Sequence, residues 1–219
     1  GSGKSSVVFA GLVPQLRNID NEEIITFRPG KNPFNALAIA LNKIQNVELN
    51  NRLEELELEV NLEHDKKSLC WFIEEKVKYQ NHNFGVGSSN PRLVIIADQF
   101  EELYTLTEES HRQSFLDLLI YTVQNAPAFS LVLTLRADFL GKALDYQPMG
   151  EAFKKYPPVL LTPMKPEELQ AAIEQPAAKL KVELEQGLTS KLIDDLGSQP
   201  GRLPLLEFTL SLLWDKHEK

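Results

Sequence analysis

The residues with the clearest capacity for chemistry are the first six, which carry two glycines, a lysine and three serines. They are Gly1, Ser2, Gly3, Lys4, Ser5 and Ser6. The pattern matches the second half of a phosphate-binding P-loop, G-x-x-x-x-G-K-S/T, in which glycines let successive backbone N–H groups converge on a phosphate. In such a loop Lys4 reaches the β- and γ-phosphates, Ser5 completes the coordination of Mg²⁺, and Ser6 contacts the α-phosphate. The six residues alone are equally compatible with a polar linker.

Polar residues also follow two apolar runs further along the chain. The run Leu93–Ala97 ends in Asp98, and the run Leu131–Leu135 ends in Arg136. Such runs are typical of buried parallel strands, and open α/β sheets bind ligands at the carboxyl ends of their strands. We therefore expect Asp98 to hold the Mg²⁺ ion of a bound nucleotide and Arg136 to sense its γ-phosphate. The alternative for Asp98 is a helix cap. For Arg136 it is an ion pair with a neighbouring acid: Asp98, Glu101 or Asp138.

The residue directly after Asp98 is Gln99, where many P-loop ATPases have a second acid that polarises the attacking water. Glu101 or Glu102 would have to supply this base from the following turn. If neither reaches the site, the protein binds ATP and hydrolyses it slowly, which suits a switch better than a motor. Both glutamates are equally compatible with acids of a helix N-terminus that have no chemical role.

Apolar periodicity predicts the elements that position these residues. Helix patterns cover residues 7–16, 34–44, 48–66, 69–79 and 110–124, and strand patterns cover 24–27, 93–97, 131–135 and 159–162. In the acidic stretch 48–66 a solvated helix is expected, with one apolar face made of Leu49, Leu53, Leu56 and Val60. Strands alternating with helices, then helices alone from Lys165, predict a P-loop α/β domain over residues 1–163 and a helical subdomain over 164–219.

Composition narrows the classes of function. The net charge of -8 argues against binding to duplex nucleic acid and to anionic membranes. The single cysteine, Cys70, excludes an internal disulfide and suits a reducing compartment, so we expect a cytoplasmic location. Neither a signal peptide nor a membrane-spanning apolar run is present in the sequence. The histidines lack the spacing of a zinc site: His64, His82, His111 and His217.

Five blocks of the sequence resemble the novel STAND NTPases, a family of signal-transduction ATPases with numerous domains that is typically bacterial. The blocks are the P-loop stretch with Ala10-Gly11-Leu12 and Pro14, then Arg28-Pro29-Gly30, Asp98–Leu103, Leu133–Phe139 and Pro200–Glu207. The resemblance covers nearly the whole chain, and its two most specific blocks are DQFEEL and LTLRADF.

The resemblance implies an AAA+-like sheet of about five parallel strands with the P-loop strand in the middle, then a small helical domain. It also implies that Pro204 contacts the nucleotide base, although Pro204 equally fits a plain helix start. Family members are often fused to WD-type repeats or effector domains. Bound ADP is expected to hold a closed monomer, which exchange for ATP opens to oligomerise. The implied ligands are ATP or ADP with Mg²⁺. The implied partners are a second copy and C-terminal sensor or effector domains, without nucleic acid or membrane.

Three functions follow from these observations. The first is an ATP/ADP-dependent molecular switch, the NTPase module of a larger multidomain signalling protein. The second is a hydrolysis-deficient pseudo-ATPase that serves as a protein-interaction scaffold, which Gln99 favours. The third, ATP-driven remodelling of proteins or DNA, is disfavoured by the acidic charge. Because the P-loop strand would precede Gly1, we expect this chain by itself to bind nucleotide poorly, with a displaced N-terminus. Its open strand edge would then invite pairing with another chain.

Overall fold

The structure is a computed structural model that describes residues 3–19, 22–43, 52–84, 92–197 and 203–216. Contacts divide the chain into two units, Val7–Pro158 on the one hand and Gly1–Ser6 with Val159–Lys219 on the other. Each unit is described by itself. Among the described residues, none of the helices combines the length and the apolar character that a membrane crossing requires.

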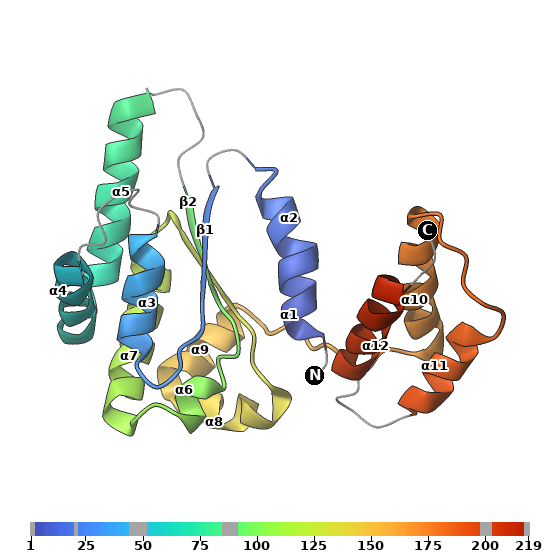
Figure 1. Ribbon diagram of the computed structural model, residues 1–219. Coiled ribbons are helices and arrows are strands. Elements are labelled where there is room, and N and C mark those ends of the chain that lie inside the picture. The colour runs from blue at the N-terminus through green and yellow to red at the C-terminus, as the bar shows by residue number, and fades with distance from the viewer. Residues whose placement is uncertain (1–2, 20–21, 44–51, 85–91, 198–202, 217–219) are drawn as a thin grey trace. The chain divides into compact units, whose positions relative to one another are not determined.

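A parallel three-stranded sheet forms the centre of the Val7–Pro158 unit (Figure 1). Its order is β1-β2-β3, with the bounds β1 Glu22–Phe27, β2 Arg92–Ala97 and β3 Phe129–Leu133. The register pairs Phe27 with Ala97, and Ala97 with Leu133, so the three strands end level with one another. The residues that follow the three strands therefore share one edge of the sheet, as the sequence predicts for Asp98.

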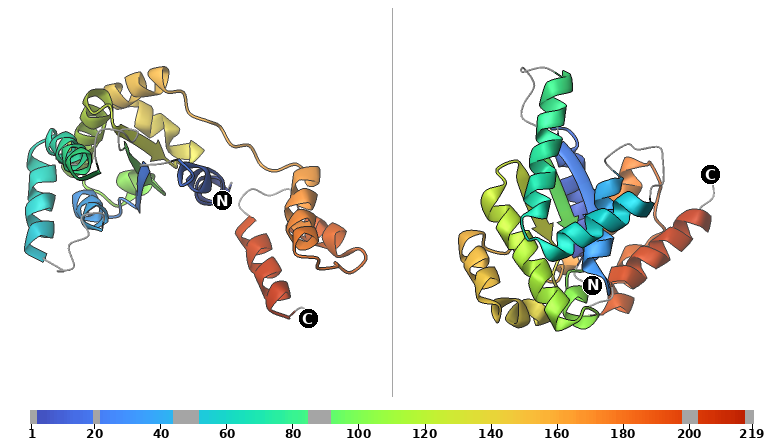
Figure 2. Two further views of the ribbon diagram at one scale, coloured as in Figure 1. Left: turned by 90° about the horizontal axis from the view of Figure 1, so that it is seen from above. Right: turned by 90° about the vertical axis from the view of Figure 1, so that its left-hand side faces the viewer.

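Helices cover both faces of this sheet, as Figures 1 and 2 show. The more heavily covered face packs on helices with the bounds α3 Pro33–Asn42, α5 Ser68–Phe84 and α7 Glu109–Asn125, and α4 Arg52–His64 packs on α3. The other face packs on a helical stretch with the bounds η1 Val7–Leu12 (a π-helix) and α2 Val13–Leu16. The short helix α1 Lys4–Ser6, which precedes this stretch in the chain, is grouped with the second unit. Successive residues of β2 serve the two sides alternately. Ile95 lies in the large core, whereas Val94 and Ile96 pack near Val8 and Val13.

The acidic stretch forms helix α4, but its buried side differs from the prediction. Leu62 is 1% exposed, and Leu58 packs against the large core. Asn35 of α3 donates a hydrogen bond of 2.6 Å to the Glu59 carboxylate. The predicted apolar face is instead largely exposed: Leu53 is 69% exposed, Leu56 is 45% exposed and Val60 is 51% exposed. Leu49 lies outside the described residues. The prediction fails because a helix rich in leucine has two apolar stripes, and packing on α3 selects one of them.

The segment 159–162, predicted to be a strand, has no regular secondary structure and is grouped with the second unit. Val159 is 87% exposed and Leu160 is 72% exposed. A strand is stable only when its N–H and C=O groups bond to a neighbour, and none of the described strands pairs with this segment. The described residues thus form a sheet of three strands with β2 in the middle, and the prediction of a strand over 159–162 is wrong.

Only helices follow Pro166 in the described residues. Their bounds are α10 Pro166–Lys179, α11 Leu188–Leu196 and α12 Leu203–Lys216. They share a small core of Ile173, Leu196 and Leu206. That these helices form an independent domain, with a boundary at residue 163, stays a prediction. The short elements after β2 and β3 are α6 Glu102–Thr105, η2 Ala137–Phe139, α8 Leu140–Leu144 and α9 Gln147–Lys155.

Candidate functional site

Asp98 is a buried carboxylate at the carboxyl end of β2, with 2% of its surface exposed. The Thr134 hydroxyl, which follows β3 by one residue, donates a hydrogen bond of 2.7 Å to Asp98 Oδ1. The same hydroxyl accepts a hydrogen bond of 2.9 Å from the backbone N–H of Gln99. Burying a carboxylate is costly unless polar partners compensate it, so Thr134 helps to stabilise and orient Asp98. Sequence reasoning missed Thr134. Its place at the end of a predicted strand was the available signal.

Arg28 supplies positive charge beside this carboxylate. Its Nε lies 3.6 Å from Asp98 Oδ2, and its side chain is 59% exposed. That distance is too long for a hydrogen bond, so the two groups form an ion pair in which the arginine is exposed to solvent and the carboxylate is buried. Sequence reasoning treated Arg28 as part of a turn and of a family block. The pairing of Phe27 with Ala97 is what brings it next to Asp98.

Glu102, one of the two candidate bases, holds the loop that follows β1. Its carboxylate accepts a hydrogen bond of 3.1 Å from the Gly30 N–H. Thr107, which is buried, donates a hydrogen bond of 2.8 Å to the Gly30 carbonyl. Gly30 has φ +58°, a conformation that glycine adopts without a steric penalty. Both backbone groups of Gly30 are thereby fixed by side chains that follow Asp98 in the chain.

Glu101, the other candidate base, accepts a hydrogen bond of 3.3 Å from the backbone N–H of Arg136. The Arg136 guanidinium bonds to both oxygens of Asp138, at 3.1 Å from Nε and 2.7 Å from Nη2. It also lies 5.7 Å from the centroid of the Phe139 ring. The structure therefore has the ion pair that was the alternative for Arg136. Its sensing of a γ-phosphate stays a prediction.

Gln99 occupies a left-handed backbone conformation, with φ +54°. A residue other than glycine adopts this conformation at a cost of roughly 1 kcal/mol. The turn lets the next residue, Phe100, donate its N–H to the Thr134 carbonyl at 2.9 Å and bury its ring. The chain thus changes direction sharply at the residue that follows the buried carboxylate.

A comparison with protein families identifies the chain. The family described as novel STAND NTPase 1 matches residues 1–219. The chain belongs to this family. Comparisons with curated proteins and with solved structures gave no match. Family membership confirms the resemblance and supports a nucleotide-binding P-loop NTPase.

The P-loop residues of this STAND NTPase open a helix. Gly3 has φ +75°, and α1 begins at Lys4 and includes Ser5 and Ser6. Gly1 and Ser2 lie outside the described residues. Contacts group Gly1–Ser6 with the second unit, which also contains Pro204 in the first turn of α12. None of these residues is therefore placed relative to Asp98. Their roles at the nucleotide stay predictions.

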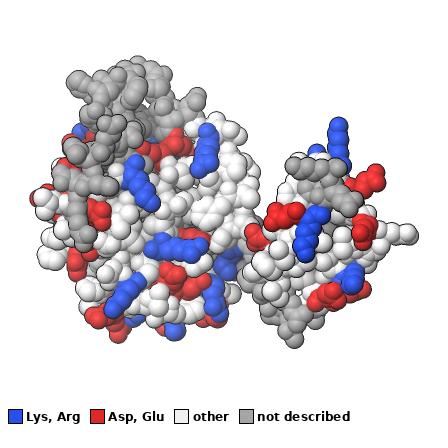
Figure 3. All heavy atoms as spheres, in the orientation of Figure 1, with Lys and Arg blue, Asp and Glu red and all other residues white. Residues whose placement is uncertain are grey.

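The oxygen groups around Asp98 suit the metal that a STAND NTPase is expected to use. Within the described ranges, no cluster of three or more His, Cys, Asp or Glu side chains is arranged to hold a metal ion. Mg²⁺ at a nucleotide site typically has one or two protein oxygens, with phosphate and water oxygens completing its shell. A single buried carboxylate beside a hydroxyl fits that role. Figure 3 shows that acidic and basic side chains are interspersed on the visible face of the Val7–Pro158 unit.

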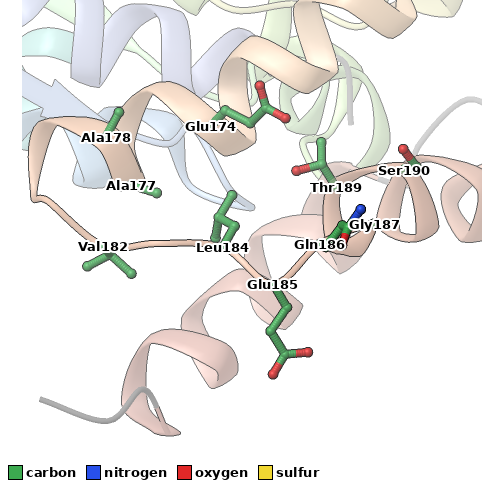
Figure 4. A pocket seen from close by; sticks show the side chains of 10 residues that line it. All are labelled: Glu174, Ala177, Ala178, Val182, Leu184, Glu185, Gln186, Gly187, Thr189 and Ser190. Atoms are coloured by element: carbon green, nitrogen blue, oxygen red, sulfur yellow. The ribbon is translucent and has the colours of Figure 1, made fainter.

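A hollow of about 360 Å³ lies in the second unit, between α10 and α11 (Figure 4). Its lining includes the acids Glu174 and Glu185 and the hydroxyls of Thr189 and Ser190, but neither lysine nor arginine. A phosphate there would meet charges of its own sign. The hollow is therefore a poor candidate for the triphosphate, and the edge of the sheet around Asp98 is the better one.

Proposed function

We propose that this STAND NTPase is an ATP/ADP-dependent molecular switch, the NTPase module of a larger multidomain signalling protein in which nucleotide exchange controls oligomerisation. The observation that carries the proposal is the buried Asp98 carboxylate, oriented by Thr134 at the carboxyl edge of a parallel sheet. In P-loop NTPases an acid at this place holds the Mg²⁺ ion of the nucleotide. Open α/β sheets also bind their ligands at this edge.

Each predicted residue has a defined task in this proposal. Lys4 neutralises the β- and γ-phosphates as a point charge, and the Ser5 hydroxyl contributes an oxygen to the metal. Asp98 holds the metal, commonly through water. Mg²⁺, when bound, offsets the negative charge that develops on the phosphate oxygens. Arg136 senses the γ-phosphate, and Pro204 lies against the base.

Hydrolysis is expected to be slow. The position after Asp98 is an amide, Gln99, which cannot act as a base. Glu101 and Glu102 each accept a hydrogen bond from a backbone N–H, so part of their capacity to orient a water is already in use. A slow hydrolysis step keeps the protein in its ATP state long enough to signal, as a switch requires.

The second candidate is a hydrolysis-deficient pseudo-ATPase that acts as a protein-interaction scaffold. The same two observations favour it, namely Gln99 and the hydrogen bonds that hold Glu101 and Glu102. It differs from the switch in one respect that can be measured, because a scaffold needs no turnover and no response to the loss of Asp98.

The test measures nucleotide binding, turnover and molecular mass in the full-length protein. A switch predicts binding of ADP and ATP that Lys4→Ala abolishes, slow turnover that Asp98→Ala abolishes, and a larger assembly with ATP than with ADP. Binding without turnover, unaffected by Asp98→Ala, would support the scaffold instead. Equal mass with ATP and ADP would contradict the switch, and the lack of any nucleotide binding would contradict both.

A further inference from the structure

Two arginines lie at the carboxyl edge of the sheet, and they differ in their neighbours. Arg136 is held by both oxygens of Asp138. Arg28 instead faces the buried carboxylate of Asp98, at 3.6 Å from Oδ2. Arg28 thus places a positive charge beside the predicted metal-binding acid, although the P-loop pattern assigns no role to this residue.

Hydrogen bonds hold the backbone on both sides of Arg28. Before it, Phe27 accepts a hydrogen bond of 2.9 Å from the Asp98 N–H. After it, Gly30 is held through its N–H by Glu102 and through its carbonyl by Thr107. Both anchors belong to the segment that begins at Asp98. The backbone on both sides of Arg28 is thus held close to the carboxylate, while the exposed Arg28 side chain is able to change its rotamer.

The ion pair itself is suited to exchange. The Asp98 side chain is 3% exposed and needs a compensating charge, whereas the Arg28 side chain is 59% exposed and is hydrated wherever it points. At 3.6 Å the contact lacks the short, aligned geometry of a strong charge-assisted hydrogen bond. A divalent cation at Asp98 would supply the same compensation and would repel the guanidinium. If Arg28 leaves Asp98 while a nucleotide is bound, its guanidinium can pair with the phosphates, which suit its geometry and charge.

We propose that Arg28 exchanges partners with the nucleotide state. It neutralises Asp98 when no nucleotide is bound, and it contacts the terminal phosphate of ATP once Mg²⁺ takes its place at Asp98. Glu102 and Thr107 are positioning residues that hold the loop from which Arg28 reaches. This inference rests on the proposed function, and it adds a residue that distinguishes ATP from ADP.

The test is calorimetric titration of the full-length protein with ATP and with ADP, each over a range of Mg²⁺ concentrations. Arg28→Gln removes the charge, and Arg28→Lys keeps the charge but loses the planar fork. Arg92→Gln is the matched control, because Arg92 is an exposed arginine at the opposite end of β2, the strand that Asp98 follows, and it donates a hydrogen bond to Ser130. Thermal unfolding of each variant verifies that the fold is intact.

Arg28→Gln is expected to weaken ATP binding about tenfold at saturating Mg²⁺, the usual size for one lost charge-assisted hydrogen bond. ADP binding should change much less, and the Mg²⁺ concentration needed for half-maximal ADP binding should fall, since the competing cation is gone. Arg28→Lys should lie between Arg28→Gln and the unaltered protein. If the unaltered protein binds nucleotide but both variants bind ATP as it does, the role of Arg28 is refuted. It is equally refuted if Arg28→Gln weakens ATP and ADP alike and raises the Mg²⁺ requirement. If the unaltered protein binds neither nucleotide, the proposed function itself fails.

Discussion

Replacing Thr134 with valine tests the central claim that its hydroxyl holds the buried carboxylate. Valine matches threonine in shape, so Thr134→Val removes the hydroxyl and leaves the packing nearly unchanged. The change deletes a donor to Asp98 Oδ1 at 2.7 Å and an acceptor for the Gln99 N–H at 2.9 Å. Thr134 is only 4% exposed, so water cannot readily replace either bond.

The expected loss follows from these two bonds. A hydrogen bond to a charged group contributes about 1.5–3 kcal/mol, and an unsatisfied buried N–H costs about 1–3 kcal/mol. We therefore expect Thr134→Val to lower the free energy of unfolding by about 3 kcal/mol, measured by urea denaturation of this chain. Thr134→Ser, which keeps the hydroxyl and loses one methyl group, should cost about 1 kcal/mol.

Thr122→Val is the matched control, because Thr122 is fully buried in α7 and its hydroxyl donates a hydrogen bond of 2.8 Å to an uncharged acceptor, the Leu118 carbonyl. The Leu118 carbonyl lies within the same helix, so losing the hydrogen bond from the Thr122 hydroxyl should cost about 1 kcal/mol. Repeating Thr134→Val in an Asp98→Ala background removes the acceptor first, and the cost should then fall to about half. The reasoning is wrong if Thr134→Val costs no more than Thr122→Val, or costs the same with and without Asp98.

Three further predictions concern other parts of the chain. Burial raises the pKa of Tyr104 to about 12, and burial together with the hydrogen bond to Asp117 raises the pKa of Tyr146 to about 12, from an ordinary value of 10.0. Both groups thus favour the folded state below pH 10, and the free energy of unfolding should fall between about pH 10 and 12. In the double variant Tyr104→Phe with Tyr146→Phe, the free energy of unfolding measured by urea denaturation should depend less on pH over this range. An unchanged pH dependence would contradict the prediction. Gly30 has φ +58° and open space around an added Cβ, so Gly30→Ala should cost about 1 kcal/mol of stability from backbone strain alone. Gly141→Ala inside α8 should instead stabilise the protein by up to about 1 kcal/mol. If both variants shift the calorimetric melting temperature in the same direction, backbone strain at Gly30 is not what distinguishes them. Leu62→Ala should lower the free energy of unfolding by about 2–4 kcal/mol, because Leu62 is 1% exposed. Leu56→Ala should lower it by less than about 1 kcal/mol, because Leu56 lies on the same helix and is 45% exposed. A larger loss in Leu56→Ala than in Leu62→Ala would mean that the face predicted from sequence is the buried one.

The elements and the family were within reach of the sequence. Leu93–Ala97 is a strand because five consecutive apolar residues suit a segment buried on both faces, and β2 covers that run. Because parallel strands end at one edge, the place of Asp98 followed from the same pattern. The P-loop stretch with the DQFEEL and LTLRADF blocks identified the family that the comparison confirms. Each of these conclusions depends on short runs of consecutive residues and on their order in the chain.

The partners of those residues were decided by the tertiary structure. The run 159–162 has the composition of a strand, but a strand exists only where another backbone accepts its hydrogen bonds. Leucine spacing in α4 allowed two faces, and packing on α3 selected the one with Leu62. Thr134 and Arg28 lie 36 and 70 residues from Asp98 in the numbering, and only the register of three strands brings them to it. Local patterns determine which way a side chain points from its own element, whereas the strand pairing determines what it meets there.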